Sequence, residues 1–321
     1  MRRPPSADER AIDVVVVGEI NPDIIVSDPD PAPRFGQQER IVESVTFTLG
    51  SSSVIAACGM ARLGLRVAMV GVVGDDPFGR YMLDAMRERA IDTSACRVDP
   101  ALPTGASVIL ANQSDRAILT APGTIAEVRA ADVPDYLLAG TRHVHVGSYF
   151  IQTALQPALP ELFKTAHAHG ATTSLDSNDD PTGRWNSGLT DALAETDLFF
   201  PNENEARAIA RIDDALTAGT RLASGDRSPI VAIKLGQDGA AAAVDGKVIA
   251  QVAAYPVDLV DAVGAGDSFD AGFISAWLDG APLDRCLRLG AVCGALSSRA
   301  IGGTSGQPTR AEAYDAERGW T

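Results

Sequence analysis

The stretch Leu259-Val-Asp-Ala-Val-Gly-Ala-Gly-Asp-Ser-Phe-Asp-Ala-Gly-Phe-Ile274 decides how the rest of the chain is interpreted. A short apolar entry leads into a Gly-Ala-Gly turn, and Asp267 then opens an apolar-periodic run that continues through Trp277. Gly264 and Gly266 allow the backbone to turn sharply and admit a ligand close to the main chain. The pattern therefore predicts a loop that leads directly into the first turn of a helix.

The first turn of that helix is a predicted anion-binding site, because its free N–H groups converge and the helix dipole adds positive charge. Asp267 places a carboxylate beside the site, where it would repel a phosphate group rather than bind it. A carboxylate in this position is suited to take a proton from an attacking hydroxyl, while metal ions and backbone dipoles neutralise the phosphate. These residues indicate a phosphotransferase that acts on hydroxyl groups.

The same stretch has other interpretations. Aspartate is a favoured N-cap residue, and glycine-rich turns between strand and helix occur in many α/β proteins. The P-loop pattern G-x-x-x-x-G-K-[ST] does not occur in the chain. The dinucleotide-binding fingerprint would need glycine at position 269, where the chain has Phe269, so a nicotinamide-dependent dehydrogenase is disfavoured.

The composition limits the classes of protein to which the chain can belong. The chain has 321 residues, 45% of them hydrophobic, which is enough for one large α/β domain. Its net charge of −15 argues against binding to nucleic acid or to an anionic membrane, and no apolar run approaches the length of a membrane span. The four cysteines form no C-x-x-C pair, which favours reduced thiols in a cytoplasmic protein. Residues 1–10 are expected to be a disordered tail, followed by a single domain over 11–321.

The order of elements predicts an α/β fold, with a central, mostly parallel sheet and helices on both faces. Ile12–Val17 is β-branched and continuous, as expected of a buried parallel strand. The remaining expected strands lie at 67–73, 143–146, 172–175, 198–200 and 230–234, and the expected helices include 50–63, 154–169 and 203–210.

Two segments, at about 24–48 and 104–120, do not follow this alternation of strands and helices. Both alternate apolar and polar residues, and the second has the pattern of a β-hairpin around residues 112–115. Together they are expected to form a small sheet beside the main one. Such a sheet is suited to act as a lid that excludes water from phosphoryl transfer.

Polar residues follow several of the expected strands, at the edge of a parallel sheet where α/β folds bind ligands. Asn21 and Asp23 offer an amide and a carboxylate for sugar-type hydroxyls, although an ordinary Asn-Pro-Asp turn explains them equally simply. The spacing of Asn202 and Glu205 is that of a helix capping box, and the functional interpretation is no stronger than this structural one. Further polar clusters lie at 176–178 and 234–239.

With these residues together, the chain resembles the ribokinase-like, or PfkB, family of carbohydrate and nucleoside kinases from about Val14 to Thr309. The most specific element is Asp261–Gly272, which is similar to the C-terminal signature of that family. The resemblance implies a three-layer α/β/α fold and an ATP-dependent kinase with Mg²⁺ and K⁺ as cofactors. It also implies that Asp267 is the general base and that Gly264, Ala265 and Gly266 form the anion hole.

The resemblance implies roles for the other polar clusters. Asn202 and Glu205 are similar to a motif that helps to place magnesium and phosphate, and Lys234–Gly239 resembles a loop that contacts the nucleotide. The implied ligands of a monovalent cation are Asp261, Val263 and the loop near Gly302. Sites implied for the sugar are Asn21, Asp23, Gly50, Ser51 and Asn178, and those implied for the nucleotide are Asn202, Glu205, Lys234, Gly236 and Gly239. Family members often pair through their lid sheets, so a homodimer is expected.

The chain departs from the family pattern where the N-terminal signature usually has Gly-Gly, three residues and then Asn. Here Gly50 is followed by Ser51, and Ile55 replaces the asparagine that often contacts the sugar. The departure weakens the case for ribose in particular. A small sugar or sugar acid is the expected acceptor. A nucleoside kinase, with Ile55 lining a base pocket, and a catalytically silent sugar-binding relative stay open as alternatives.

Overall fold

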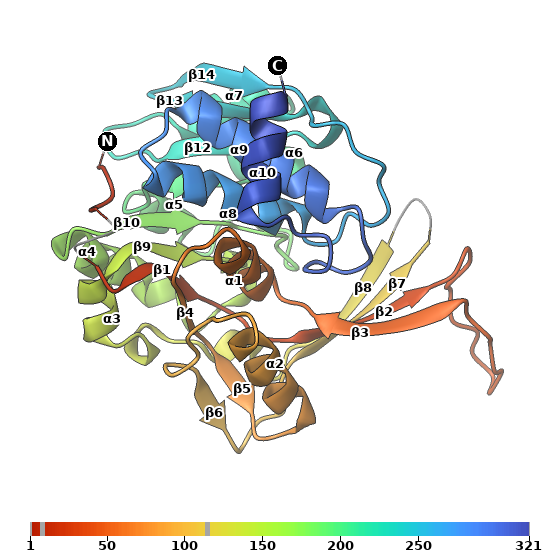
Figure 1. Ribbon diagram of the computed structural model, residues 1–321. Helices are drawn as coiled ribbons and strands as arrows, with labels where there is room; N and C mark the ends of the chain where they lie inside the picture. Colours follow the sequence, from red (N-terminus) through yellow and green to blue (C-terminus); the bar gives the residue numbers. More distant parts are fainter. Residues whose placement is uncertain (1, 7–9, 113–115, 321) are drawn as a thin grey trace.

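The computed structural model describes residues 2–6, 10–112 and 116–320. Its main sheet has eight strands, in the order β14-β13-β12-β11-β10-β9-β1-β4, and is parallel from β12 to β4 (Figure 1). The strands are β14 (Lys247–Val252), β13 (Ala240–Val244), β12 (Ile230–Lys234), β11 (Leu198–Phe199), β10 (Thr172–Leu175), β9 (Thr141–Val146), β1 (Ile12–Val17) and β4 (Val67–Val70).

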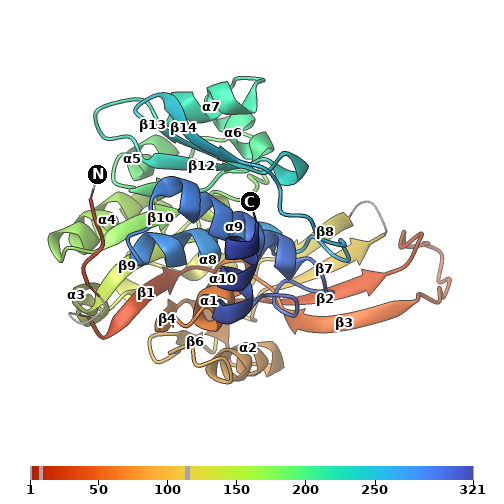
Figure 2. The ribbon, with the colours of Figure 1, turned by 45° about the horizontal axis from the view of Figure 1, so that its top comes forward.

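Helices cover both faces of the main sheet, so the expected three-layer α/β/α architecture is confirmed (Figure 2). One face carries α1 (Ser52–Arg62), α2 (Pro77–Arg87), α8 (Ala265–Leu278), α9 (Leu283–Ser297) and α10 (Arg310–Gly319). The other carries α3 (Asp135–Gly140), α4 (Leu159–Ala168), α5 (Leu189–Leu193), α6 (Glu203–Ala210) and α7 (Ala215–Leu222).

Strand β1 shows why the sheet is sandwiched. Val14 and Val16 pack into one core, Val15 and Val17 pack into the other, and all four are fully buried. Side chains of a strand alternate between faces, so a continuous apolar run serves a strand that is covered on both sides. Strand β1 lies beside the edge strand β4, and residues that follow its end, among them Glu19 and Asn21, line the cleft.

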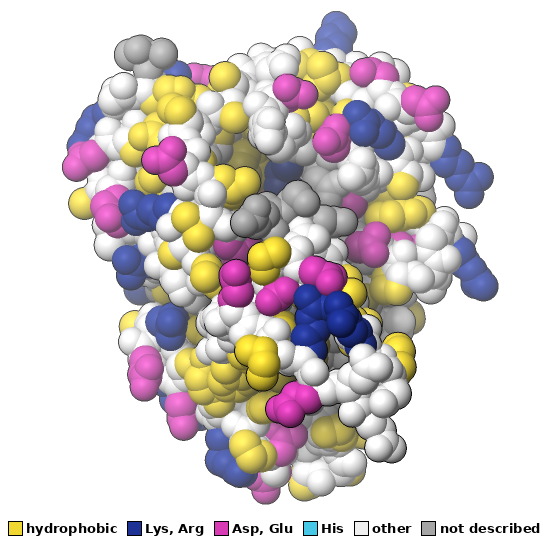
Figure 3. Space-filling view, turned by 90° about the vertical axis from the view of Figure 1, so that its right-hand side faces the viewer, with side chains coloured by type: hydrophobic (Ala, Val, Ile, Leu, Met, Phe, Trp, Pro, Cys, Tyr) yellow, Lys and Arg dark blue, Asp and Glu magenta, His cyan; other side chains and the backbone are white. Residues whose placement is uncertain are grey.

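A second, small sheet lies beside the main one and projects from the body in both ribbon views (Figures 1 and 2). It has the strand order β3-β2-β7-β8 and is built from the segments at 24–48 and 104–120. Residues 113–115 of the hairpin turn lie outside the described part of the chain. Hydrophobic side chains are among those on the surface of this end (Figure 3). The strands are β3 (Ser44–Leu49), β2 (Pro22–Ser27), β7 (Ala106–Ala111) and β8 (Arg116–Ala121).

Two expected elements have different bounds. The strand expected at 67–73 divides at Gly71 into β4 and β5 (Val72–Gly74), and β5 pairs with β6 (Arg97–Asp99) rather than with the main sheet. Gly71 packs against its neighbours so closely that a Cβ there would lie 2.6 Å from the carbonyl oxygen of Gly18. The helix expected at 154–169 begins only at Leu159, because 156–158 form a 3₁₀ turn and Pro160 favours a helix start.

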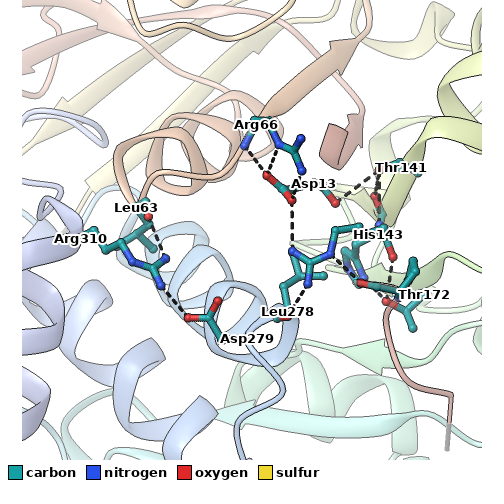
Figure 4. A network of polar contacts seen from close by, with 11 residues as sticks. Asp13, Leu63, Arg66, Thr141, His143, Thr172, Leu278, Asp279 and Arg310 are labelled. Atoms are coloured by element: carbon teal, nitrogen blue, oxygen red, sulfur yellow. Dashed lines mark hydrogen bonds and ion pairs between the residues drawn. The ribbon is translucent and has the colours of Figure 1, made fainter. Parts of the chain in front are cut away.

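An ionic network around the buried Asp13 and Arg142, completed by the half-exposed Arg66, joins the far ends of β1, β4 and β9 (Figure 4). The Asp13 carboxylate accepts hydrogen bonds from the backbone and side chain of Arg66, at 2.9 Å and 3.0 Å, and from Nη1 of Arg142 at 3.1 Å. Burial alone would raise the pKa of Asp13, but these donors lower it to about 2. The network therefore stabilises the folded state only while Asp13 is ionised.

The N-terminal segment contacts this region where it is described. Nε of Arg142 donates to the carbonyl oxygen of Pro5 at 2.8 Å, and the Arg10 guanidinium donates to the carbonyl oxygens of Ala139 and His169. Residues 1 and 7–9 of the expected disordered tail lie outside the described part. No helix within the described ranges has both the length and the apolar content needed to cross a bilayer.

The Asp13 network yields a stability prediction. Asp13→Asn leaves Arg142 buried without its charge partner, which is expected to lower the free energy of unfolding at pH 7 by about 3–5 kcal/mol. The difference from wild type should shrink between pH 4 and pH 2, because wild-type Asp13 becomes protonated there. Urea denaturation at each pH measures it.

Asp315→Asn is the matched control, because the Asp315–Arg318 pair is exposed and should contribute less than about 1 kcal/mol. Equal effects of the two substitutions would contradict a stabilising role for the buried network.

Candidate active site

Helix α8 begins at the cleft, as the Gly-Ala-Gly pattern predicts. Gly264 has φ of +73° and occupies the N-cap position. The N–H of Ala265 donates to the carbonyl oxygen of Ala262 at 3.3 Å, whereas no group in the described part of the chain accepts from the amides of Gly266 and Asp267. These two amides lie in the first turn of α8, at the positive end of its dipole. They are the amides that remain available to an anion at this turn, whereas the amide of Ala265 already has a partner.

Asp267 lies in the first turn of α8 and lines the cleft. Its side chain accepts a hydrogen bond from Oγ of Ser52, at the start of α1. Burial raises its pKa to about 7, with a further contribution from the negative charge of Asp176, although the Ser52 hydroxyl acts in the opposite direction. A carboxyl group with this pKa is poised to accept a proton near neutral pH.

The cleft is a cavity of about 550 Å³ between the ends of the parallel strands and the small sheet. Acidic side chains dominate its charged lining, and Lys234 and Arg116 supply the cationic groups among the described residues. The acidic residues that line it are Glu19, Asp23, Asp176, Glu203, Glu205 and Asp267.

Residues expected to bind the acceptor lie together on one side of the cavity. Asn21, Asp23, Ser51 and Asn178 line it directly. Burial raises the pKa of Asp23 to about 7, so this carboxyl can donate or accept a hydrogen bond near neutral pH. Gly50 does not line the cavity but lies directly behind Asp23, where a Cβ would lie only 2.1 Å from Oδ1 of that carboxyl.

A buried carboxylate that the sequence analysis did not single out forms part of the same wall. Glu19 accepts hydrogen bonds from the hydroxyls of Ser51, Ser53 and Ser148 at 3.1, 2.7 and 2.9 Å, and from Nε2 of Gln152 at 3.3 Å. These donors hold the ends of β1 and β9 and the start of α1 in one arrangement. The signal available in the sequence was a glutamate directly after a buried strand.

A buried ion cluster forms the floor of the cavity. Nζ of Lys234 donates to Oδ2 of Asp176 at 2.7 Å and to Oδ1 of Asp270 at 3.3 Å. Burial alone would lower the pKa of Lys234, but the two carboxylates hold it well above its ordinary value. For the acid Asp270 burial acts in the other direction and raises the pKa. Its Oδ2 has no hydrogen-bond partner in the described structure. Asp270 follows Asp267 by three residues, a spacing that places both on the same side of α8.

Asn202 and Glu205 form a capping box at the start of α6, and both line the cavity. Burial raises the pKa of Glu205 to about 7, and the negative charge of Asp176 adds to that effect. The structural and functional interpretations of this motif are therefore compatible, because the helix cap itself presents the carboxyl group to the cleft.

A second cavity of about 550 Å³ adjoins the first, and Lys234, Gly236 and Gly266 line both. Its lining is mostly apolar and includes Gly239 and Phe269. The expected nucleotide-binding loop therefore lies at the junction between a polar cavity and an apolar one. This shape suits a ligand with a phosphate chain at one end and a flat apolar group at the other.

The three groups implied for a monovalent cation lie together. Oδ1 of Asp261 accepts the N–H of Val263 and Oδ2 accepts the N–H of Gly302, both at 2.9 Å. The contacts shown are therefore N–H groups bonded to a carboxylate, which fix the loop before α8 against the loop after α9.

Comparison with known proteins agrees with this geometry. The family model described as pfkB family carbohydrate kinase matches residues 11–310. An ATP-dependent ribose-1-phosphate kinase of Halopiger xanaduensis is 29% identical, over 91% of this chain and 94% of the relative. A fructokinase of Klebsiella pneumoniae is 30% identical, over 81% of this chain and 88% of the relative.

Solved structures give the same result. A PfkB protein from Polaromonas sp. JS666 is 27% identical with a TM-score of 0.77, covering 95% of this chain and 99% of that one. Arabidopsis thaliana ribokinase in complex with ribose and ATP is similar in fold, with a TM-score of 0.80 at 21% identity, and the match covers 96% of this chain and 99% of that one.

The turn before α8 yields a prediction about two glycines. Gly264→Ala would place a Cβ 2.7 Å from Cα of Gly303, at a left-handed φ, and should lower the free energy of unfolding by about 1–3 kcal/mol. Gly266→Ala is the matched variant, because its Cβ would come no closer than 3.4 Å to another group. Thermal and urea unfolding should show it as stable as wild type. Equal losses in both variants would contradict the strain assigned to Gly264.

Proposed function

We propose, because the chain belongs to the pfkB family of carbohydrate kinases, that it transfers the γ-phosphoryl group of ATP to a hydroxyl of a small sugar or sugar acid. The observation that carries the proposal is the carboxyl group of Asp267 beside the unpartnered amides of Gly266 and Asp267. This arrangement lies between a polar cavity suited to hydroxyls and an apolar cavity suited to a nucleotide base.

The reaction follows from the position of each group. Asp267 accepts the proton of the acceptor hydroxyl, whose oxygen then forms a bond to the γ-phosphorus as the bond to the β-phosphate oxygen breaks. The amides at the start of α8 hold negative charge on the transferring group. Asn21, Asp23 and Asn178 orient the acceptor. The products are the phosphorylated acceptor and ADP.

Magnesium fits the electrostatics of the cleft. At Glu205 and Asp267 burial outweighs the attraction of Lys234 and raises the pKa of both carboxyl groups, so a further cation would favour their ionised forms. No three acidic, histidine or cysteine side chains in the described ranges converge closely enough to hold a metal by themselves. We therefore propose that Mg²⁺ is held by the nucleotide phosphates together with Glu205, and that it neutralises phosphate charge when bound.

A monovalent cation, K⁺ by preference, is proposed at the loops that Asp261 joins. The carboxylate of Asp261 and the backbone near Val263 and Gly302 are candidate oxygen donors. Because this carboxylate also fixes the turn before α8, cation binding there would stabilise the anion site.

One observation favours a second candidate, a nucleoside kinase. Isoleucines line the acceptor side of the cavity as well as polar groups, and a nucleobase would find an apolar wall there. Ile55 is only 3% exposed and packs against Gly264 and Gly303, so it supports the turn rather than forming an open pocket. The other isoleucines at the cavity are Ile109, Ile118, Ile125 and Ile151.

A homodimer in the cytoplasm is also proposed. The small sheet exposes Val45, Phe47 and Leu119 on its face away from the cavity, with 42–60% of each residue accessible, and pairing of two small sheets through that face would cover them. All four cysteines are free thiols, which agrees with a reducing compartment.

The role of Asp267 yields a prediction. Asp267→Asn should lower kcat by about 10²–10⁴ with little change in KM, because it removes the general base. In wild type, kcat/KM should fall as the pH drops below about 7, since the protonated carboxyl cannot accept a proton. Ser52→Ala should keep most of kcat but move this fall to higher pH. In wild type the Ser52 hydroxyl stabilises the ionised carboxylate of Asp267, so its removal raises the pKa of Asp267 further. Wild-type turnover by Asp267→Asn would show that another group is the base.

A coupled assay of ADP release tests the function itself. Sugars, sugar acids and nucleosides are offered with ATP, Mg²⁺ and K⁺, and we expect acceptor-dependent ADP release with a sugar or sugar acid. Release with nucleosides only would favour the nucleoside kinase. If calorimetry showed sugar binding but no acceptor released ADP, the chain would be a silent binding protein.

A further inference from the structure

Helices α5, α6 and α7 lie together over one face of the main sheet (Figure 2). Residues of all three line a groove of about 490 Å³. It is separate from both cavities of the proposed active site and shares no lining residue with them. Its apolar floor includes Trp185, Leu189 and Leu193, and Arg211, Arg221 and Arg227 line it.

The charge of this groove is opposite to that of the chain. The chain carries a net charge of −15, yet no acidic side chain is among the residues that line the groove. Arg227 pairs with Glu195 at 2.8 Å, but the guanidinium groups of Arg211 and Arg221 have no hydrogen-bond or ion-pair partner among the described residues. Two unpaired guanidinium groups beside an apolar floor favour an anion that carries an apolar body.

The end of α7 does not oppose an anion strongly, because its last carbonyl groups already accept hydrogen bonds. Oγ of Ser224 donates to the carbonyl oxygen of Thr220 at 2.6 Å. The carbonyl oxygen of Ala223 accepts from Oγ of Ser228 and from the amide of Gly246, both at 2.9 Å. These two carbonyl groups at the negative end of the helix therefore have partners within the chain.

Two segments connect the groove with the active-site cavity. Helix α6 has Asn202 and Glu205 of the cavity at its start and Arg211 of the groove at its C-cap. The loop 178–188 begins at Asn178 in the cavity and reaches Trp185 in the groove.

This loop holds an unusual number of left-handed residues. Asn178, Trp185 and Ser187 have φ of +52°, +53° and +44° without being glycine. The strained segment is held by the Asp180 carboxylate, which accepts the amide of Trp185 at 2.6 Å. The indole ring packs edge-on against Phe150 with centroids 5.3 Å apart, and the next residue along the chain, Ile151, lines the active-site cavity.

We propose that this groove binds a small organic anion with an apolar body, and that α6 and the loop 178–188 couple its occupancy to the active-site cavity. The guanidinium groups of Arg211 and Arg221 hold the anionic group, and Trp185 and the leucines contact the apolar body. The proposal goes beyond the kinase reaction, and its binding test needs no substrate of that reaction.

Phenyl phosphate is a suitable probe, with phenol as its neutral counterpart, and the fluorescence of Trp185 reports on binding. Phenyl phosphate should give a saturable change that weakens as salt is added, and phenol should bind more weakly. The double substitution Arg211→Ala, Arg221→Ala should weaken phenyl phosphate at least about tenfold, since it removes two charge-assisted contacts. Trp185→Phe should abolish the signal.

Arg318→Ala is the matched control, because Arg318 lies on α10, far along the chain from the groove, and is exposed. It should leave probe binding unchanged. Equal affinity of wild type and the double variant would overturn the groove site, as would affinity for phenol equal to that for phenyl phosphate. Binding that persists in the double variant and is displaced by ATP would place the probe in the active-site cavity instead.

Hydrogen–deuterium exchange tests the coupling without any kinase assay. On addition of phenyl phosphate, amides of 178–181 and 203–206, which do not line the groove, should exchange more slowly in wild type and not in the double variant. Protection confined to the residues that line the groove would overturn the coupling.

Discussion

The floor of the cleft depends on the two ion pairs that the ammonium group of Lys234 forms. This group joins Asp176 at the end of β10 to Asp270 in α8, at 2.7 Å and 3.3 Å, from the end of β12. Two buried carboxylates this close would repel each other strongly without a cation between them. The pairing therefore sets where α8 begins relative to the sheet, and with it the direction in which the amides of Gly266 and Asp267 point.

Because Lys234 is paired with Asp176 and Asp270, it does not neutralise the other acidic side chains of the cleft. Asp23, Glu205 and Asp267 all have pKa values raised to about 7, mainly by burial. An acid whose pKa is higher in the folded state binds more protons there than in the unfolded chain. Its contribution to stability is complete below its ordinary pKa and is lost as the pH rises towards 7. Ionisation of these three acids thus opposes folding near neutral pH, and a cation that binds with a nucleotide would reduce that cost.

Much of this arrangement was predictable from sequence, because local rules and tertiary structure agree there. The turn at Gly264 needs a positive φ, and β1 needs apolar residues on both faces. The sequence meets these requirements with a glycine at the turn and a continuous apolar run in the strand. The hairpin of β13 and β14 was not predicted, because Ala240–Ala243 has no β-branched residue and sheet pairing there comes from burial rather than propensity.

The polar contacts of the site were harder to predict because they join residues far apart in the chain. Glu19 contacts Ser148 and Gln152, which lie more than a hundred residues away, and Ser52 contacts Asp267 across 215 residues. Spacing along a helix or strand carries no information about such pairs. Asp176 was visible at a strand end, but its partner Lys234 lies 58 residues further on.

The departure at the N-terminal signature has a physical explanation in these contacts. Ser51 adopts φ of +68° and ψ of 124°, a conformation in which glycine is favoured, so the serine is strained there. Its hydroxyl offsets this strain by donating to Glu19, at 2.6 Å to the carbonyl oxygen, and by accepting the amide of Val54 at 3.1 Å as the N-cap of α1. The carboxylate of Glu19 keeps its donors from Ser53, Ser148 and Gln152 whichever residue stands at position 51. Serine at this position therefore acts on the backbone, because it caps α1 and fastens the end of β1 to it. The departure from glycine removes no polar group from the cavity, where Glu19, Asn21 and Asp23 all form part of the lining.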